Sequence, residues 1–185
     1  MKLYYPKNPN RLSARHILAD LMNETDKEFV FAEIGVYKGP MVKLLLAYTN
    51  IKQYWAIDPW HKLGPEHGRL ERITQEEWDS IYLGIAKHML NSNNLNVLRT
   101  TSENAVKIFP DKFFDIVFID DDHTYQAVKD NIIRWTPKMK HGGWLTGHDY
   151  GARRFQVTKA VDEAYGNNVR IYKETMLWLK EIDRD

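Results

Sequence analysis

The 185-residue chain is long enough for one domain with a substantial core, because 43% of its residues are hydrophobic and 12% are aromatic. Its 26 basic and 25 acidic residues give a net charge of +1, which argues against a nucleic-acid-binding or polybasic membrane surface. The absence of cysteine excludes disulfides, thiol catalysis and cysteine metal sites, and it is compatible with the cytoplasmic location that we expect. No segment resembles a signal peptide or a run of about 18 apolar residues, so we expect neither secretion nor membrane spanning.

Strand-like and helix-like segments alternate along the chain after a Pro/Asn-rich arm. The sequence predicts helices at 13–24, 39–50, 74–91, 102–109, 124–140 and 155–166. It predicts strands at 28–35, 53–58, 96–100, 114–120, 142–149, 169–174 and 175–182. Ser13 is a candidate N-cap, Pro40 suits the first position of its helix, and Thr74 with Glu77 has the spacing of a capping box. Pro137 is expected to end the helix that contains it.

The order of these elements predicts the fold. Alternation of strands with helices from residue 28 to about residue 166 favours a parallel sheet with helices on both faces. The last two strands follow each other directly and are expected to form an antiparallel hairpin at one side of the sheet. We therefore expect a single domain over residues 1–185, with an N-terminal arm and helix at 1–27 and a core at 28–180. Its fold class is α/β, with a doubly wound, mostly parallel seven-stranded sheet.

Polar residues follow the first three strands. Because ligands bind such sheets outside the carboxyl ends of the strands, these positions are candidates for a site. In "EIGVYKG", Gly35 permits a sharp turn and Gly39 permits close approach of the backbone to a ligand. Asp58 ends the second strand, where an acid suits a ribose diol, and Ser102 and Glu103 follow the third strand, where they could meet an adenine edge.

The fourth and fifth strands also end on polar residues. The fourth strand runs into "FIDDDHTY", residues 118–125, whose first acidic residue is Asp120. The fifth strand ends on His148 and Asp149. Each feature has a simple structural alternative, such as a tight turn, a helix cap at Thr101 or Ser102, or an acidic loop that caps the helix beginning at Thr124. Independent turns and caps need not place polar residues at all five strand ends, so the convergence favours a shared ligand site.

The ordered motifs "EIGVYKG", "AID", "TSENA", "FDIVFIDDDHTY" and "GGWLTGHDY" resemble the class I S-adenosylmethionine-dependent methyltransferases, whose fold is Rossmann-like. The first motif is similar to that of the catechol-type O-methyltransferases. The pattern "IDDDHTY…W…GG…GHDY" resembles a bacterial small-molecule branch that includes macrolide-sugar O-methyltransferases. The resemblance covers about residues 28–180. Tyr37 stands where dinucleotide-binding proteins have the middle glycine of G-x-G-x-x-G, which counts against a nicotinamide enzyme.

The resemblance implies S-adenosylmethionine as the cofactor. The residues implied to bind it are Glu33, Gly35, Tyr37 and Gly39 at its methionine end, Asp58 at the ribose, Ser102 and Glu103 at the adenine, and Asp120. In metal-dependent relatives the acid after strand four and a polar pair after strand five hold a divalent ion, here expected as Mg²⁺ or Mn²⁺. Those positions are Asp120, His148 and Asp149.

The pair His148-Asp149 departs from the two oxygen ligands usual in the metal-dependent relatives. A histidine ligand favours a softer ion such as Mn²⁺ or Zn²⁺ over Mg²⁺, or else His148 is not a ligand, so the metal requirement stays open. In the macrolide-sugar branch, Asp-x-x-His supplies a metal ligand and a general base, and Asp120 and His123 match it as the candidate catalytic residues. His123 suits a base because its ordinary pKa is near neutral and neighbouring acids raise its basicity.

The expected reaction is methylation of a hydroxyl group on a small molecule, such as a sugar, a polyketide or a catechol. The expected partner is this small molecule rather than nucleic acid or a membrane, and the hairpin and the aromatic arm favour a homo-oligomer. The segment 59–75 is either a lid that carries Trp60, His61 and His67 toward the acceptor or a surface loop with Trp60 buried. The alternative function is a nucleoside-binding protein of the same fold, with other chemistry, such as a hydroxylase, or with no catalysis.

Overall fold

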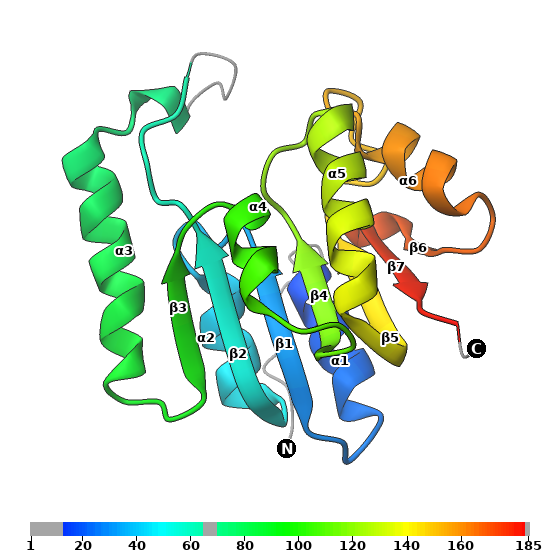
Figure 1. The fold of residues 1–185 in the computed structure, drawn as a ribbon, viewed down its shortest axis with the longest axis horizontal. Coiled ribbons are helices and arrows are strands. Elements are labelled where there is room, and N and C mark those ends of the chain that lie inside the picture. The colour runs from blue at the N-terminus through cyan, green and yellow to red at the C-terminus, as the bar shows by residue number, and fades with distance from the viewer. Residues whose placement is uncertain (1–12, 65–69, 184–185) are drawn as a thin grey trace.

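Seven strands form one sheet in the order β3-β2-β1-β4-β5-β7-β6 in the computed structural model, which describes residues 13–64 and 70–183 (Figure 1). The strands are β1 (Phe29–Ile34), β2 (Ile51–Asp58), β3 (Leu95–Arg99), β4 (Phe114–Ile119), β5 (Met139–Gly147), β6 (Arg170–Tyr172) and β7 (Leu177–Glu181). The pairs among β1 to β5 are parallel, whereas β7 runs antiparallel to both β5 and β6. The doubly wound sheet with an antiparallel C-terminal hairpin is therefore confirmed, and β6 forms its outer edge.

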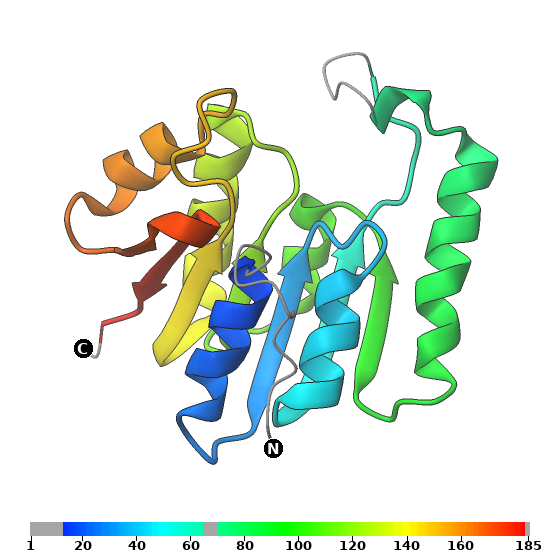
Figure 2. The ribbon, with the colours of Figure 1, turned by 180° about the vertical axis from the view of Figure 1, so that it is seen from behind.

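Helices cover both faces of the sheet. They are α1 (Ala14–Asn23), α2 (Pro40–Tyr48), α3 (Gln75–Met89), α4 (Ser102–Ala105), α5 (Tyr125–Trp135) and α6 (Val157–Tyr165). Figure 1 shows α4 and α5 in front of the sheet, and Figure 2 shows α1 and α2 on the opposite face. Among the described residues, no helix is both long and apolar enough to cross a membrane.

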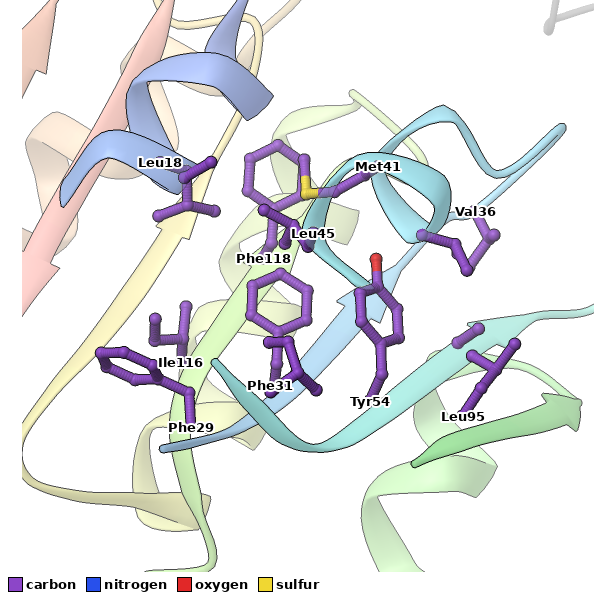
Figure 3. Packing of buried hydrophobic residues seen from close by; sticks show 14 of the residues in the cluster. Leu18, Phe29, Phe31, Val36, Met41, Leu45, Tyr54, Leu95, Ile116 and Phe118 are labelled. Atoms are coloured by element: carbon purple, nitrogen blue, oxygen red, sulfur yellow. The ribbon is translucent and has the colours of Figure 1, made fainter. Parts of the chain in front are cut away.

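Two apolar layers hold the helices against the sheet. All six residues of β1 are buried, because successive side chains of a central parallel strand enter opposite layers. Phe29 and Phe31 belong to the layer under α1 and α2, whereas Val30 and Ala32 belong to the layer under α5. Figure 3 shows the first layer, in which side chains from α1 and α2 lie over the aromatic residues of β1, β2 and β4.

Local signals at the helix ends agree with the structure. Pro40 is the first residue of α2, and Thr74 caps α3 with the capping box to Glu77. The Glu77 backbone N–H donates to Thr74 Oγ1 at 3.2 Å, and the Thr74 N–H donates to Glu77 Oε2 at 2.8 Å. Ser13 occupies the N-cap position of α1.

Two predicted helices end in 3₁₀ segments. The helix expected at 124–140 ends at Trp135, and a 3₁₀ segment, Thr136–Lys138, leads directly into β5, which begins three residues earlier than expected. Pro137 has no N–H with which to continue the helical hydrogen bonds, so the helix stops before it. The helix expected at 102–109 is the single α-helical turn α4 followed by the 3₁₀ segment Val106–Ile108.

Candidate active site

The ends of β1 and β4 meet closely at the carboxyl edge of the sheet. The Asp120 N–H donates to the Ile34 carbonyl at 2.8 Å. Gly35 adopts a φ of +88°, and a Cβ at this position would lie 2.3 Å from the Asp120 carbonyl oxygen. Only glycine fits such a turn at such a separation, so Gly35 sets where Asp120 lies.

Asp58 holds the loop after β1 in place. Its Oδ2 accepts the backbone N–H groups of Val36 and Tyr37, both at 2.9 Å, and its Oδ1 accepts the N–H of Trp60 at 2.7 Å. Burial raises the pKa of Asp58, and these three N–H groups oppose that increase. Both carboxylate oxygens of Asp58 thus already accept backbone N–H groups within the protein. The contact of Asp58 with a ribose stays a prediction.

The segment after β2 is anchored by Trp60, which is fully buried. The Trp60 indole N–H donates to the Tyr37 carbonyl at 2.9 Å, and the Trp60 carbonyl accepts from Arg99 and Gln75. Trp60 therefore stabilises the loop after β1 and is not exposed for stacking on an acceptor. Of the two interpretations of segment 59–75, a buried Trp60 is the one observed, and His67 lies outside the described residues.

Glu33 lies buried under the same loop. It is 3% exposed, and its Oε2 accepts the Tyr54 hydroxyl at 2.6 Å. Burial raises the pKa of Glu33 well above its usual value, and the charges of Asp120 and Asp58 add to the increase although the Tyr54 hydrogen bond opposes it. The buried carboxyl group is therefore favoured in its neutral form in the absence of a cation.

Ser102 and Glu103 differ in what they contact. Thr101, not Ser102, is the N-cap of α4, and Ser102 Oγ donates to Asn131 Oδ1 while it accepts the Trp135 indole N–H at 2.8 Å. The Glu103 side chain is exposed, and its carboxylate lies 3.9 Å from Lys107 Nζ. The predicted adenine contacts of both residues stay predictions, and the Ser102 hydroxyl proton is already used inside the protein.

Three groups converge at the ends of β4 and β5. His123 Nε2 lies 2.8 Å from Asp149 Oδ2 and 3.3 Å from Asp120 Oδ1. One ligand atom from each of Asp120, His123 and Asp149 can be chosen so that all lie within 4.8 Å of one another. Asp149 adopts a φ of +62°, a left-handed conformation that is uncommon outside glycine and that is often found at functional sites. We call these three residues the Asp120–His123–Asp149 cluster, and they bring an imidazole and two carboxyl groups together at the carboxyl edge of the sheet.

The cluster shifts the pKa values of its members. Burial lowers the pKa of His123, but its hydrogen bonds with Asp120 and Asp149 and their charges outweigh burial and raise the pKa to about 9. Burial raises the pKa of Asp149, but the two neighbouring histidines overcome this and hold it well below its usual range. Burial raises the pKa of Asp120, and the same histidines only partly oppose the increase. At neutral pH the imidazole is therefore protonated and lies between two carboxylates.

The predicted metal ligands lie close together. His148 Nδ1 is 3.2 Å from Asp149 Oδ2 and 3.8 Å from Asp120 Oδ1, and His123 Nε2 is nearer than His148 Nδ1 to both carboxylates. Ligand atoms about 3 Å apart suit an ion bound at about 2.1 Å, and carboxylate and imidazole donors suit Mn²⁺ or Zn²⁺. The donor set therefore fits a divalent ion, with either histidine available as the third ligand.

Asp121 and Asp122, whose roles the sequence left undefined, each have a partner. Asp122 Oδ1 accepts the backbone N–H of Thr124 at 2.9 Å, and Thr124 caps α5. Asp121 accepts the Asn131 side-chain amide at 3.0 and 2.9 Å. Burial raises the pKa of Asp121 to about 7, and the hydrogen bonds from Asn131 oppose this increase.

Two further residues at the site escaped sequence reasoning. Phe155 stacks on the His123 ring, with centroids 4.2 Å apart and an interplanar angle of 19°, and the Arg154 guanidinium lies over the same Phe155 ring. Asn131 is 2% exposed on α5, although its neighbours on that helix face are apolar. The polar residue in an otherwise apolar stripe was the available signal for Asn131, whereas no local pattern marks Phe155.

Comparison with known proteins decides the family. A family model described as "Methyltransferase domain" matches residues 32–150, which include every strand end of the site. The chain belongs to this methyltransferase family. The "Uncharacterized protein R132" of Acanthamoeba polyphaga mimivirus is 29% identical over 154 residues. That match covers 80% of this chain, and the chain spans only 65% of the viral protein.

Solved methyltransferases share the fold. The O-methyltransferase NovP superposes with a TM-score of 0.66 at 14% identity, over 92% of this chain and 78% of NovP. CalS11, a TDP-rhamnose 3'-O-methyltransferase of calicheamicin biosynthesis, has a TM-score of 0.59 at 12% identity, over 90% and 76% of the two chains. The methyltransferase domain therefore has the class I Rossmann-like fold that its motifs predicted.

Proposed function

We propose that this methyltransferase domain moves the methyl group of S-adenosylmethionine to a hydroxyl oxygen of a small molecule. The family match and the O-methyltransferase neighbours support the reaction class. The observation that carries the choice of a hydroxyl acceptor is His123, whose Nε2 lies 2.8 Å from Asp149 at the edge where this fold binds its cofactor. A base at that place is what a hydroxyl, which must lose a proton, requires.

The cofactor is proposed to lie across the carboxyl ends of β1, β2 and β4, with the contacts that the resemblance implies. The loop from Gly35 to Gly39 is already fixed by Asp58, so the loop needs little reorganisation when the cofactor binds. Glu33 is buried beneath the expected position of the cationic methionine end, and a positive charge there would favour its ionised form.

The proton balance assigns the role of His123. In the transfer a carbon–oxygen bond forms, the carbon–sulfur bond breaks with its electrons returning to sulfur, and the hydroxyl proton passes to the His123 imidazole. This step needs a neutral imidazole, whereas Asp120 and Asp149 hold the proton on His123 up to a pKa of about 9. A divalent ion bound by Asp120, Asp149 and His148 would offset the two carboxylate charges and lower the pKa of a bound hydroxyl. His123 is kept as the base in this proposal, because one nitrogen cannot bind a metal and accept a proton at the same time.

The acceptor is proposed to be a sugar, polyketide or catechol-like hydroxyl, and not a nucleic acid. The even charge balance of the chain does not favour a polynucleotide acceptor, and the structural neighbour CalS11, a TDP-rhamnose 3'-O-methyltransferase, supports the choice of a sugar hydroxyl. A cytoplasmic location and a homo-oligomer also remain our expectations.

The test combines cofactor binding with turnover. Calorimetry should detect S-adenosylmethionine binding to the wild type, and Mn²⁺ or Mg²⁺ should raise turnover on a panel of sugars, nucleotide sugars and catechols. His123→Ala should bind the cofactor within about twofold of wild type and lose roughly 10²–10⁴-fold in turnover. His88→Ala, an exposed histidine on α3, is the matched control and should retain both.

The outcomes separate the alternatives. Absence of S-adenosylmethionine binding with and without metal would overturn the proposal. Cofactor binding without methyl transfer to any acceptor would favour the nucleoside-binding alternative. Full turnover by His123→Ala would remove His123 from the reaction.

A further inference from the structure

A continuous chain of side-chain hydrogen bonds runs beneath the site. The Trp135 indole N–H donates to Ser102 Oγ at 2.8 Å, and the Ser102 hydroxyl donates to Asn131 Oδ1. The Asn131 amide then donates to both carboxylate oxygens of Asp121, at 3.0 and 2.9 Å. We call these four residues the Asn131 network.

Each hydrogen-bonding group of the network has one direction available. The Asn131 carbonyl faces a hydroxyl donor and its amide faces a carboxylate, so rotation of the amide by 180° would place its oxygen against Asp121. Asn131 is 2% exposed and Trp135 is fully buried, so water does not replace these partners. Buried hydrogen bonds of this kind resist rearrangement, because loss of one member leaves its neighbour unsatisfied.

The network joins two parts of the site that are far apart in the sequence. Asp121 directly follows Asp120 and lies two residues before His123, so its position fixes the loop between them. Ser102 is the first residue of α4, after β3, where the adenine is expected. Helix α5 connects the two, because Asn131 and Trp135 lie one helical turn apart on it.

We propose that Asn131 is a positioning residue for methyl transfer, which holds the Asp120–His123 loop through Asp121 and ties it to the adenine side through Ser102. The proposal rests on the proposed function for its catalytic readout. It assigns Asp121 to the support of the neighbouring cluster and gives Ser102 a positioning role in place of, or in addition to, an adenine contact.

A reciprocal substitution tests this arrangement. Asn131→Asp removes the amide that donates to Asp121 and places a second buried carboxyl group against it, so one of the two must bind a proton. The altered contact should lower kcat roughly 10–100-fold, the size expected when a base is misplaced by about 1 Å. Adding Asp121→Asn exchanges donor and acceptor between the two positions. The new amide at position 121 can donate to the new carboxylate at position 131, and the Ser102 hydroxyl can still donate to that carboxylate. The double variant should recover to within about threefold of wild type, a coupling that independent sites would not show. Asp130→Asn, a half-buried position of α5 whose side-chain partners Gln126 and Arg134 lie outside the network, is the matched control and should leave kcat unchanged.

Binding and spectroscopy separate positioning from general destabilisation. Asn131→Asp should change the dissociation constant of S-adenosylmethionine by less than about fivefold while kcat falls, because the loop and not the cofactor pocket is displaced. In the ligand-free protein, the His123 Cε1–H NMR resonance should shift in Asn131→Asp and return in the double variant. This second readout needs no activity, so it tests the network even if the proposed function fails.

Either of two results would overturn the proposal. One is a double variant as impaired as Asn131→Asp, with the His123 resonance equally displaced. The other is an Asn131→Asp variant that keeps wild-type kcat and an unmoved His123 resonance. Absence of methyl transfer by the wild type, with the resonance shifted and restored as described, would reject the proposed function alone.

Discussion

Replacement of Gly35 by alanine should destabilise this protein far more than the same replacement at Gly151. Both glycines have left-handed backbones, with φ of +88° at Gly35 and +87° at Gly151. An added Cβ at Gly151 meets nothing within 4 Å. At Gly35 it would lie 2.3 Å from the Asp120 carbonyl oxygen and 2.7 Å from Asp121 Cα. The pair therefore separates the cost of the backbone conformation from the cost of close packing.

The expected magnitudes follow from that difference. A left-handed conformation costs a non-glycine residue about 1–2 kcal/mol, and this applies at both positions. Overpacking adds about 1–3 kcal/mol at Gly35 only, because backbone atoms cannot move aside by changing a rotamer. The Gly35→Ala variant should thus lose about 2–5 kcal/mol in total, and about 2 kcal/mol more than Gly151→Ala. For a protein of this size, that difference corresponds to a melting temperature lower by roughly 4–8 °C.

Urea and thermal unfolding of the two variants measure this effect, and calorimetry with S-adenosylmethionine measures its functional consequence. Relief of the clash requires the ends of β1 and β4 to separate, which weakens the hydrogen bond from the Asp120 N–H to the Ile34 carbonyl. Cofactor binding should therefore weaken in Gly35→Ala and persist in Gly151→Ala. Equal stabilities for the two variants would refute the close approach of β1 to β4.

Three further predictions concern charge and stacking. The pKa of about 9 at His123 lies above the unfolded value of about 6.5, so this group stabilises the protein fully below pH 6.5 and loses that contribution, about 3 kcal/mol, as pH rises through 9. Urea unfolding between pH 6.5 and 9.5 should show the loss in wild type and not in His123→Gln. Phe155→Leu removes the ring stacked on the imidazole and should cost about 1 kcal/mol in urea unfolding, the size expected for a stacked aromatic pair. Asp115→Asn should cost about 2 kcal/mol in urea unfolding, because the buried carboxylate pairs with Lys27 and Lys140. Cofactor binding should not change, because Asp115 lies near the start of β4 and the candidate site lies at the opposite end of that strand.

The sequence predicted the sheet because its elements are local and its topology is restricted. Alternation of apolar strands with amphipathic helices requires crossovers, and right-handed crossovers leave few strand orders. Once the strands are parallel, their carboxyl ends must share one edge, so Asp58, Asp120 and Asp149 could be assigned to one site from their places in the chain. The helix ends at Pro40 and Thr74 were predictable for the same local reason.

Side-chain partners depended on packing that the sequence does not encode locally. Trp60 could have faced an acceptor, but α3 brings Tyr82 against its ring and Gln75 to its backbone carbonyl. Phe155 reaches His123 only because α6 packs beside α5. His123 lies nearer than His148 to both carboxylates. This difference likewise depends on the relative positions of the loops after β4 and β5.

The sequence by itself thus determined the order of strands and helices along the chain, the sheet edge at which a ligand site is expected and the residue types gathered there, because each follows from periodicity and chain direction. Only the tertiary structure decided which of those groups touch. It placed the His123 imidazole between Asp120 and Asp149, and it used both oxygens of Asp58 to hold the loops after β1 and β2. It also joined Asp121 to Ser102 through Asn131, a residue of α5 that no motif marks. Contacts of this kind depend on the distances between packed elements, and those distances are fixed only when the whole core assembles.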